Sequence, residues 1–210
     1  MVLAEHLTVV PVAVAVAQEG GKAVADKPWL EQRIAVANAL FSAHGLKFKL
    51  ISIKTLPARH SRLLSRDDRD ALGVYVKKGV LNLFVVAYSK DVDDPSQKRR
   101  GVHWHQRSAT NKHFVILANY SSPTVLAHEL GHFFGNPKHS DVPDNLMSYT
   151  RRGGKLFLDQ EQSRRIRESL KRYLSTAELV LSEQSSQEYR CINPVPKTSQ
   201  SNCSVPEQIP

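Results

Sequence analysis

The feature that most constrains the fold is the segment 125–139, which reads VLAHELGHFFGNPKH. Leu126, Leu130 and Phe133 recur at helical spacing, and the apolar run 113–119 lies just before them. Short apolar runs of this kind are typical of buried strands. The segment therefore predicts a helix that docks one apolar face into a core immediately after a buried strand.

A second face of this helix carries metal-ligating chemistry. His128 and His132 lie four positions apart, so both imidazoles can reach one metal ion, and Glu129 lies beside them as a base for metal-bound water. Gly135 follows where the chain must turn sharply, and His139 comes shortly afterwards. Three imidazoles with one open position are typical of a catalytic zinc ion.

The other elements alternate between strands and helices. Asp26 with Pro28 predicts a helix start, Gly45 predicts its end, and Ser65 begins a pattern that resembles a capping box. The half-exposed strand after the first helix indicates a crossover connection. The expected strands are 10–17, 46–53, 80–88, 102–107 and 113–119, the third of them central and the fourth an edge strand, and the expected helices are 26–45, 65–72, one beginning at 122–123, and 159–174.

The first apolar run, residues 7–17, has two interpretations. It resembles the core of a signal peptide, but no Lys or Arg precedes it, and Glu5 and His6 lie where a positive region belongs. We therefore expect a Val-rich buried strand, with Pro11 near its beginning.

The metal motif and a later segment together resemble a known clan. HELGHFFGNPKH, followed by Asn-Leu-Met-Ser-Tyr at 145–149, is similar to the metzincin zinc peptidases, whose signature is HExxHxxGxxH and a methionine-containing turn. The resemblance implies an α/β (α+β) catalytic domain over residues 1–181. It also implies a twisted, mixed five-stranded sheet, an active-site helix, a backing helix and a C-terminal helix. Met147 is then the turn residue that packs beneath the ligands without coordinating the metal.

Within the clan, Met-Ser-Tyr is similar to the astacins and serralysins. In those families a tyrosine two residues after the methionine reaches the metal or stabilises the oxyanion. The resemblance therefore makes Tyr149 a candidate catalytic residue.

The sequence departs from the clan pattern at the third ligand. Lys138 occupies the family position of the third histidine, and His139 follows one residue later. A protonated lysine has no lone pair for zinc, so we expect a one-residue bulge at Pro137 that restores His139 as ligand. Asp141 is the alternative, because carboxylates also bind zinc.

These residues predict a zinc-dependent endopeptidase in which Glu129 is the general base. One alternative is a zinc hydrolase of narrow specificity that acts on a single partner or on a cell-wall peptide. Another is a non-catalytic, zinc-bound interaction module for anionic surfaces. Glu129 favours an enzyme, because a binding module needs the histidines but not the base.

The edge strand 102–107 carries two further histidines. His103 and His105 flank Trp104, so alternation places both on the face opposite the indole. They either contribute to a second metal site, line the rim of the cleft, or are simply exposed. We expect an extended polypeptide substrate to pair with this strand.

The basic excess does not indicate nucleic-acid binding. The formal net charge is +9, but its clusters at 98–100, 151–152 and 164–167 lack interleaved aromatic residues or a nucleic-acid motif. We interpret them as a solvated surface. The sequence contains no run of about 18 apolar residues, so we expect no membrane span. We also expect a monomer.

From residue 182 the composition shifts to Ser, Gln, Pro and Asn, which predicts a C-terminal tail, 182–210. Cys191 and Cys203 lie in it. A disulfide between them would dock the tail and imply an oxidising compartment. Two free thiols are one alternative, and a thiolate that caps the zinc is another. We expect a secreted or periplasmic protein, with a cytoplasmic location as the alternative.

Overall fold

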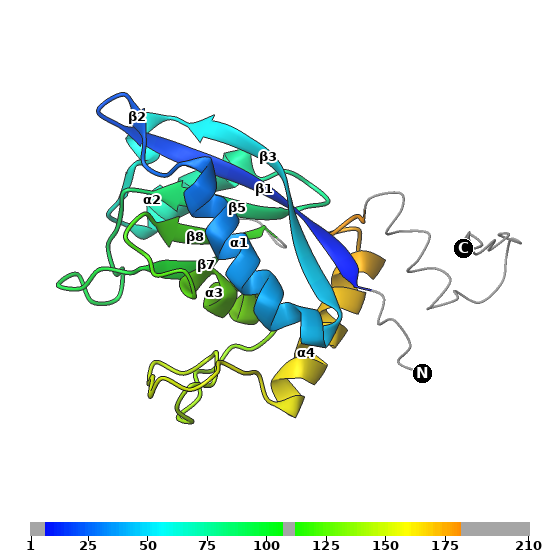
Figure 1. Ribbon diagram of the computed structural model, residues 1–210. Coiled ribbons are helices and arrows are strands. Elements are labelled where there is room, and N and C mark those ends of the chain that lie inside the picture. The colour runs from blue at the N-terminus through cyan, green and yellow to red at the C-terminus, as the bar shows by residue number, and fades with distance from the viewer. Residues whose placement is uncertain (1–6, 107–111, 182–210) are drawn as a thin grey trace, which may run out of the picture.

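A mixed β-sheet forms the centre of the computed structural model, which describes residues 7–106 and 112–181 (Figure 1). The strands are β1 Thr8–Glu19, β2 Lys22–Ala23, β3 Leu46–Leu56, β4 Arg62–Leu63, β5 Leu81–Val86, β6 Tyr88–Ser89, β7 Gly101–His105 and β8 His113–Ala118. The helices are α1 Lys27–Phe41, α2 Arg66–Asp70, α3 Val125–Phe133 and α4 Gln160–Ser175, with short 3-10 helices at Ser42–His44, Ala58–His60 and Ala71–Tyr75. The expected α+β class is confirmed.

The main sheet runs in the order β3-β1-β5-β8-β7, with β2 paired to the end of β1. Neighbouring long strands are parallel except β7, which is antiparallel to β8. The helix α1 connects the parallel strands β1 and β3, as the crossover prediction requires. Strand β7 lies at the edge, as expected.

One expected strand is divided in two. The run 80–88 forms β5, which pairs with β1 and β8, and then β6, which pairs with β4 in a separate two-stranded sheet. The apolar pattern is continuous through both strands, so it does not show where the chain changes partners.

Each face of the sheet has its own core. Helices α1 and α3 cover one face, where apolar residues of β1, β5 and β8 meet Leu30, Ile34 and Leu130. The opposite face packs against the segment between β3 and β5, which supplies Leu63 and Leu72. The sheet is thus covered on both sides where its strands are most apolar, in keeping with their fully buried pattern.

The start of α1 follows the predicted cap. The Asp26 carboxylate accepts the Trp29 N–H at 2.9 Å, and Pro28 lies in the first turn. The predicted capping box at Ser65 is also present, with Asp68 as its second member, although α2 is only 5 residues long and continues as 3-10 helix.

The predicted start of α3 is wrong. Ser122 and Pro123 were expected to begin it, but they form a turn, and the helix begins at Val125 after Thr124 without a side-chain cap. The Arg33 guanidinium from α1 donates instead to the Ser121 carbonyl at 2.5 Å and fixes this turn. The contact joins residues 88 positions apart, so a sequence pattern cannot show it.

The last helix, α4, begins at a capping box made by Asp159 and Gln162. It buries Ile166, Leu170 and Tyr173, and the Tyr173 hydroxyl donates to the Phe133 carbonyl at 2.6 Å. This bond ties α4 to the end of α3. Among the residues that the structure describes, no helix has both the length and the apolar character needed to cross a membrane.

Candidate active site

Helix α3 places three polar side chains at a cleft although its packing leaves them largely buried. His128 is 9% exposed and Glu129 7% exposed, and His132 is half-buried beside them. The apolar face with Leu126 and Leu130 lies in the core, as predicted. The core contacts of the helix thus set the direction of its polar face.

Backbone carbonyls fix the orientation of both helix imidazoles. His128 Nδ1 lies 2.8 Å from the Leu146 carbonyl, and His132 Nδ1 lies 2.7 Å from the Asn136 carbonyl. A carbonyl only accepts, so each Nδ1 carries the proton and each Nε2 keeps its lone pair. Burial also lowers the pKa of His128 to about 4, which keeps the ring neutral. Neutral imidazoles with fixed tautomers are the form that binds a metal ion.

The turn after α3 brings a third imidazole to the same place. Gly135 has φ +91, and a side chain there would also meet Ser169 of α4, so glycine serves both the turn and the close approach. His139 then lies with its Nε2 3.2 Å from His132 Nε2. One ring nitrogen from each of His128, His132 and His139 lies within 4.8 Å of the others, and we call this group the α3 triad.

The other residues considered for the third ligand lie outside this group. Lys138 and Asp141 are exposed, and within the described part of the chain the cluster around the two helix histidines includes His139 but not Asp141. Because Pro137 and Lys138 lie on the surface, the inserted residue is accommodated in the turn.

The methionine turn lies directly under α3. Met147 is fully buried, and its sulfur lies so close to Gly131 that a side chain at Gly131 would collide with it. The Asn145 side chain accepts the Met147 N–H at 2.9 Å and pairs with Gln162 at 2.9 and 3.1 Å. The turn is thereby connected to the first turn of α4.

Asn145 and Gln162 are site residues that the sequence analysis missed. Both are buried, and their side-chain amides exchange two hydrogen bonds. The sequence offers one indication, since an asparagine two residues before Met147 is typical of an Asx turn. Its partner Gln162 gives no such indication, because the capping box at the start of α4 already accounts for a glutamine at this position.

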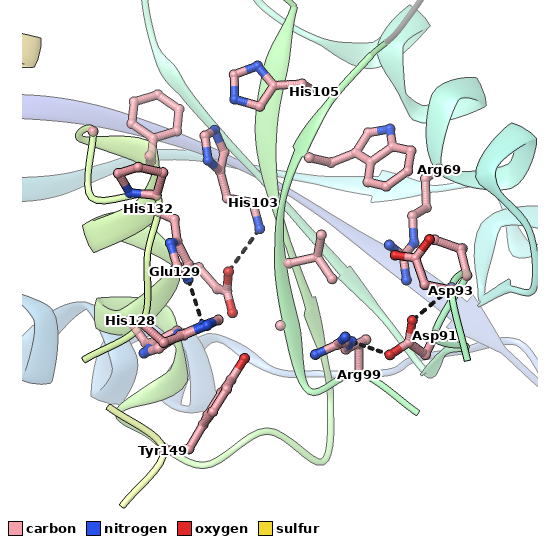
Figure 2. Close-up of a pocket in the computed structure, with 18 of the residues that line it drawn as sticks. Arg69, Asp91, Asp93, Arg99, His103, His105, His128, Glu129, His132 and Tyr149 are labelled. Carbon is pink, nitrogen blue, oxygen red and sulfur yellow. Dashed lines mark hydrogen bonds and ion pairs between the residues drawn. The ribbon is translucent and has the colours of Figure 1, made fainter. Parts of the chain in front are cut away.

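Glu129 faces the edge strand across the cleft floor. Its Oε2 accepts the backbone N–H of His103 at 2.8 Å, as Figure 2 shows. Burial raises the pKa of Glu129 to about 7, and the His103 hydrogen bond opposes this shift. The carboxyl group can therefore exchange a proton near neutral pH.

Tyr149 lies at the mouth of the site (Figure 2). Its ring centroid is 4.2 Å from that of His139 and 5.8 Å from that of His128, and the residue is 69% exposed. Partial burial raises the pKa of its phenol, so the hydroxyl keeps the proton that it could donate.

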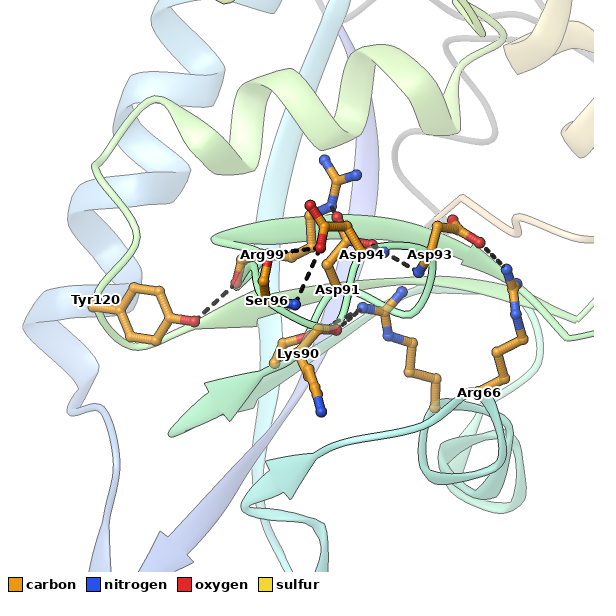
Figure 3. Close-up of polar contacts among 10 residues, drawn as sticks. Arg66, Lys90, Asp91, Asp93, Asp94, Ser96, Arg99 and Tyr120 are labelled. Atoms are coloured by element: carbon orange, nitrogen blue, oxygen red, sulfur yellow. Dashed lines mark hydrogen bonds and ion pairs between the residues drawn. The ribbon is translucent and has the colours of Figure 1, made fainter.

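A cleft of about 530 Å³ joins these residues to the edge strand β7 and to the loop before it. In that loop Asp91 accepts the backbone N–H groups of Asp93 and Asp94 and pairs with Arg99 at 2.6 Å (Figure 3). These backbone bonds hold the pKa of the Asp91 carboxyl below its usual range. Arg99 is exposed, as expected, and it also lines the cleft.

His103 and His105 also line the cleft, opposite Trp104 as predicted. Asp144 accepts the backbone N–H groups of Arg152 and Gly154 at 2.8 and 3.0 Å. Cys191, Cys203 and the expected tail 182–210 lie outside the described residues.

No protein-family model matches the chain, and no curated protein matches it by sequence. Solved structures do match. Mature mirolysin of Tannerella forsythia aligns at TM-score 0.58 and 13% identity, over 83% of this chain and 99% of that one. Metalloproteinase-II of Bacteroides fragilis aligns at TM-score 0.54 and 15% identity, over 80% and 55% of the two chains. Archaemetzincin of Methanopyrus kandleri aligns at TM-score 0.50 and 16% identity, over 80% and 97%.

These similarities are to metzincin-type zinc metallopeptidases, and at such identities they describe the fold. The chain therefore has the metzincin fold of zinc peptidases.

Proposed function

We propose that the protein is a zinc-dependent endopeptidase. The observation that carries this proposal is the convergence of the α3 triad and Glu129 on one cleft beside an open sheet edge. A purely structural metal site needs the imidazoles but gives no reason for a buried carboxyl group at the cleft floor.

The α3 triad fits a zinc ion. His128, His132 and His139 supply three imidazole nitrogens, and carbonyl groups hold two of the rings in the ligating tautomer. When bound, zinc would make water more acidic and polarise the carbonyl of the scissile bond.

Glu129 moves the proton in this proposal. Its carboxylate takes a proton from the attacking water and passes it to the nitrogen of the leaving amine. The His103 N–H at 2.8 Å holds Oε2 in place, so the group is oriented before substrate arrives.

Tyr149 stabilises the oxyanion. Its phenol remains protonated at neutral pH and lies against the His139 ring, where it can donate to the negative oxygen that forms on the scissile carbonyl.

The substrate is a polypeptide in extended form, bound by a single copy of the chain along β7. This strand pairs with β8 on one side only, and its residues 101–105 line the cleft. Backbone hydrogen bonds to this edge would align the peptide across the α3 triad. The expected segment 102–107 ends at residues that are not described. Nucleic acid has no part in this proposal.

A secreted or periplasmic location belongs to the same proposal. It is supported by the oxidising compartment that a Cys191–Cys203 disulfide would require.

The experiment measures zinc content and hydrolysis of a peptide library, using the full chain and its Glu129→Gln variant. Glutamine keeps the size of the side chain but cannot take the proton, so hydrolysis should fall by about 10²-fold or more while zinc content is unchanged. A parent chain that binds zinc but cleaves no peptide would favour the interaction module. A variant as active as the parent would exclude Glu129 as the base.

A further inference from the structure

A second group of three histidines lies on two neighbouring strands. His105 on β7 is the direct antiparallel partner of His113 on β8, and His103 lies two residues before His105 on the same face. We call His103, His105 and His113 the β7–β8 triad. Strand pairing alone therefore gathers these rings, although the partners His105 and His113 lie 8 positions apart in the sequence.

The three rings are in mutual contact. Their centroids lie 4.5 Å apart for His103 and His105, 5.0 Å for His103 and His113, and 5.0 Å for His105 and His113. One nitrogen from each ring lies within 4.8 Å of the others, the same limit that the α3 triad meets. His103 Nε2 and His113 Nδ1 face each other at 2.7 Å.

A carboxylate fixes the ring that is deepest in the protein. His113 is 6% exposed, and its Nε2 contacts Glu178 Oε1 just after α4. A carboxylate accepts, so Nε2 carries the proton and the Nδ1 lone pair points toward His103. A carboxylate behind a ligating imidazole is a recurrent arrangement in metal sites, where it sets the tautomer and makes the ring more basic.

The surroundings hold the rings in place and leave access on one side. Phe133 stacks on His113 at 4.3 Å and 15°, and Tyr173 lies 5.3 Å from the same ring. His105 is exposed, and both it and His103 line the cleft. A small cation can therefore enter from the cleft, whereas the far side is packed.

We propose that His103, His105 and His113 bind a second divalent transition-metal ion, for which zinc is the favoured species, with Glu178 orienting His113. Imidazole nitrogen is a ligand that suits such ions. The alternative is a hydrogen bond between His103 and His113 in a protein that holds no ion there. The ion would connect the edge strand to its neighbour and, through Glu178, to the segment after α4.

The proposal does not depend on peptide hydrolysis, so metal stoichiometry tests it. The full chain is loaded with Zn²⁺, dialysed, and analysed for zinc by mass spectrometry. We expect about two zinc ions per chain in the parent, and about one in His105→Ala. His139→Ala should also retain about one, and the double variant almost none. His105 is chosen because it is exposed, and circular dichroism checks that each variant folds.

A second variant and a second metal keep the test decisive. His103→Gln retains a hydrogen-bonding side chain but loses the imidazole, and it should also lose about one zinc ion. Co²⁺ loading should give visible absorption bands in His139→Ala that His105→Ala removes from the same background.

Two results would overturn the proposal. One is a parent with a single zinc ion that His139→Ala alone removes, which would leave the proposed peptidase intact. The other is a second ion that both His105→Ala and His103→Gln retain. A single ion lost in His105→Ala but kept in His139→Ala would instead support this site and contradict the zinc site of the proposed function.

Discussion

The α3 triad and the β7–β8 triad are built from different kinds of structure. The first takes two rings from one helix and the third from the turn that Gly135 opens. The second takes all its rings from two paired strands. Backbone carbonyls orient His128 and His132, whereas a carboxylate, Glu178, contacts His113.

The difference indicates where each triad can be altered. The α3 triad depends on loops, because Leu146 and Asn136 belong to the segments that follow the helix. The β7–β8 triad depends on strand register, because a slip of one residue would turn the histidines of one strand to the other face. Loop substitutions should therefore affect the first triad more than the second.

The largest effect is expected at the third ligand of the α3 triad. His139→Ala removes a ligating ring, so the zinc affinity of the variant should fall by more than about 100-fold. Substitutions of the residues that only orient metal ligands already cost about 10–100-fold. Titration against a competing chelator measures it. The matched controls are Lys138→Ala and Asp141→Ala, both exposed, which should bind nearly as the parent does. Loss in Asp141→Ala with retention in His139→Ala would assign the ligand to the carboxylate.

The next largest effect is expected at Asn145, which supports the methionine turn beneath the ligands. Asn145→Ala leaves the buried Gln162 Nε2 and the Met147 N–H without their shared acceptor, which should cost about 1–3 kcal/mol of unfolding free energy. Zinc affinity at the α3 triad should fall by about 10–100-fold. Urea unfolding and chelator competition measure the two effects, with the exposed Thr150→Ala as control. An equal loss at the β7–β8 triad would remove the distinction between the two sites.

A smaller effect is expected at Glu178. Glu178→Gln can still accept from His113 but carries no charge, so metal affinity at the β7–β8 triad should fall by about 10-fold. The matched control is Glu168→Gln on the exposed face of α4, which pairs only with Arg164 among the ion pairs of the described residues. Co²⁺ titration of a His139→Ala background isolates the site. An unchanged affinity would show that Glu178 does not orient the ring.

The smallest effect concerns pH. Backbone N–H groups of Arg152 and Gly154 hold the pKa of Asp144 below its ordinary value of 3.8. Because the pKa of this carboxyl group is lower in the folded protein than in the unfolded chain, its contribution to stability is complete above the ordinary pKa. That contribution is lost as pH falls through the pKa of the folded state. After correction for intrinsic exchange rates, the amides of Arg152 and Gly154 should therefore be less protected from hydrogen exchange in acid. The β8 amides that pair with β7 serve as the reference.

The sequence predicts the α3 triad well because its information is local. His128 and His132 lie on one helix, and the turn residue Gly135 has the expected positive φ. The bulge at Pro137 was inferred from ligand chemistry, since lysine cannot coordinate. Capping patterns likewise located the starts of α1 and α2, because each cap is formed within a few residues.

The β7–β8 triad could be predicted only in part because its information is not local. Alternation placed His103 and His105 on one face, but His113 joins them only through strand register. Arg33 and Gln162 gave no indication for the same reason, since their partners lie 88 and 17 positions away. When tertiary packing sets the hydrogen-bond partner of a residue, no regular spacing in the sequence indicates that contact.

The bonds between α4 and the rest of the site also affect the chain during its synthesis. Gln162 holds the methionine turn, Ser169 lies against Gly135, and Tyr173 binds the end of α3. All three contacts come from a helix that leaves the ribosome after the histidines of the α3 triad. While α4 is still inside the exit tunnel, the methionine turn, the turn at Gly135 and the end of α3 lack these contacts. If the chain has the proposed peptidase activity, a nascent chain would begin to cleave peptides only after α4 has emerged and docked.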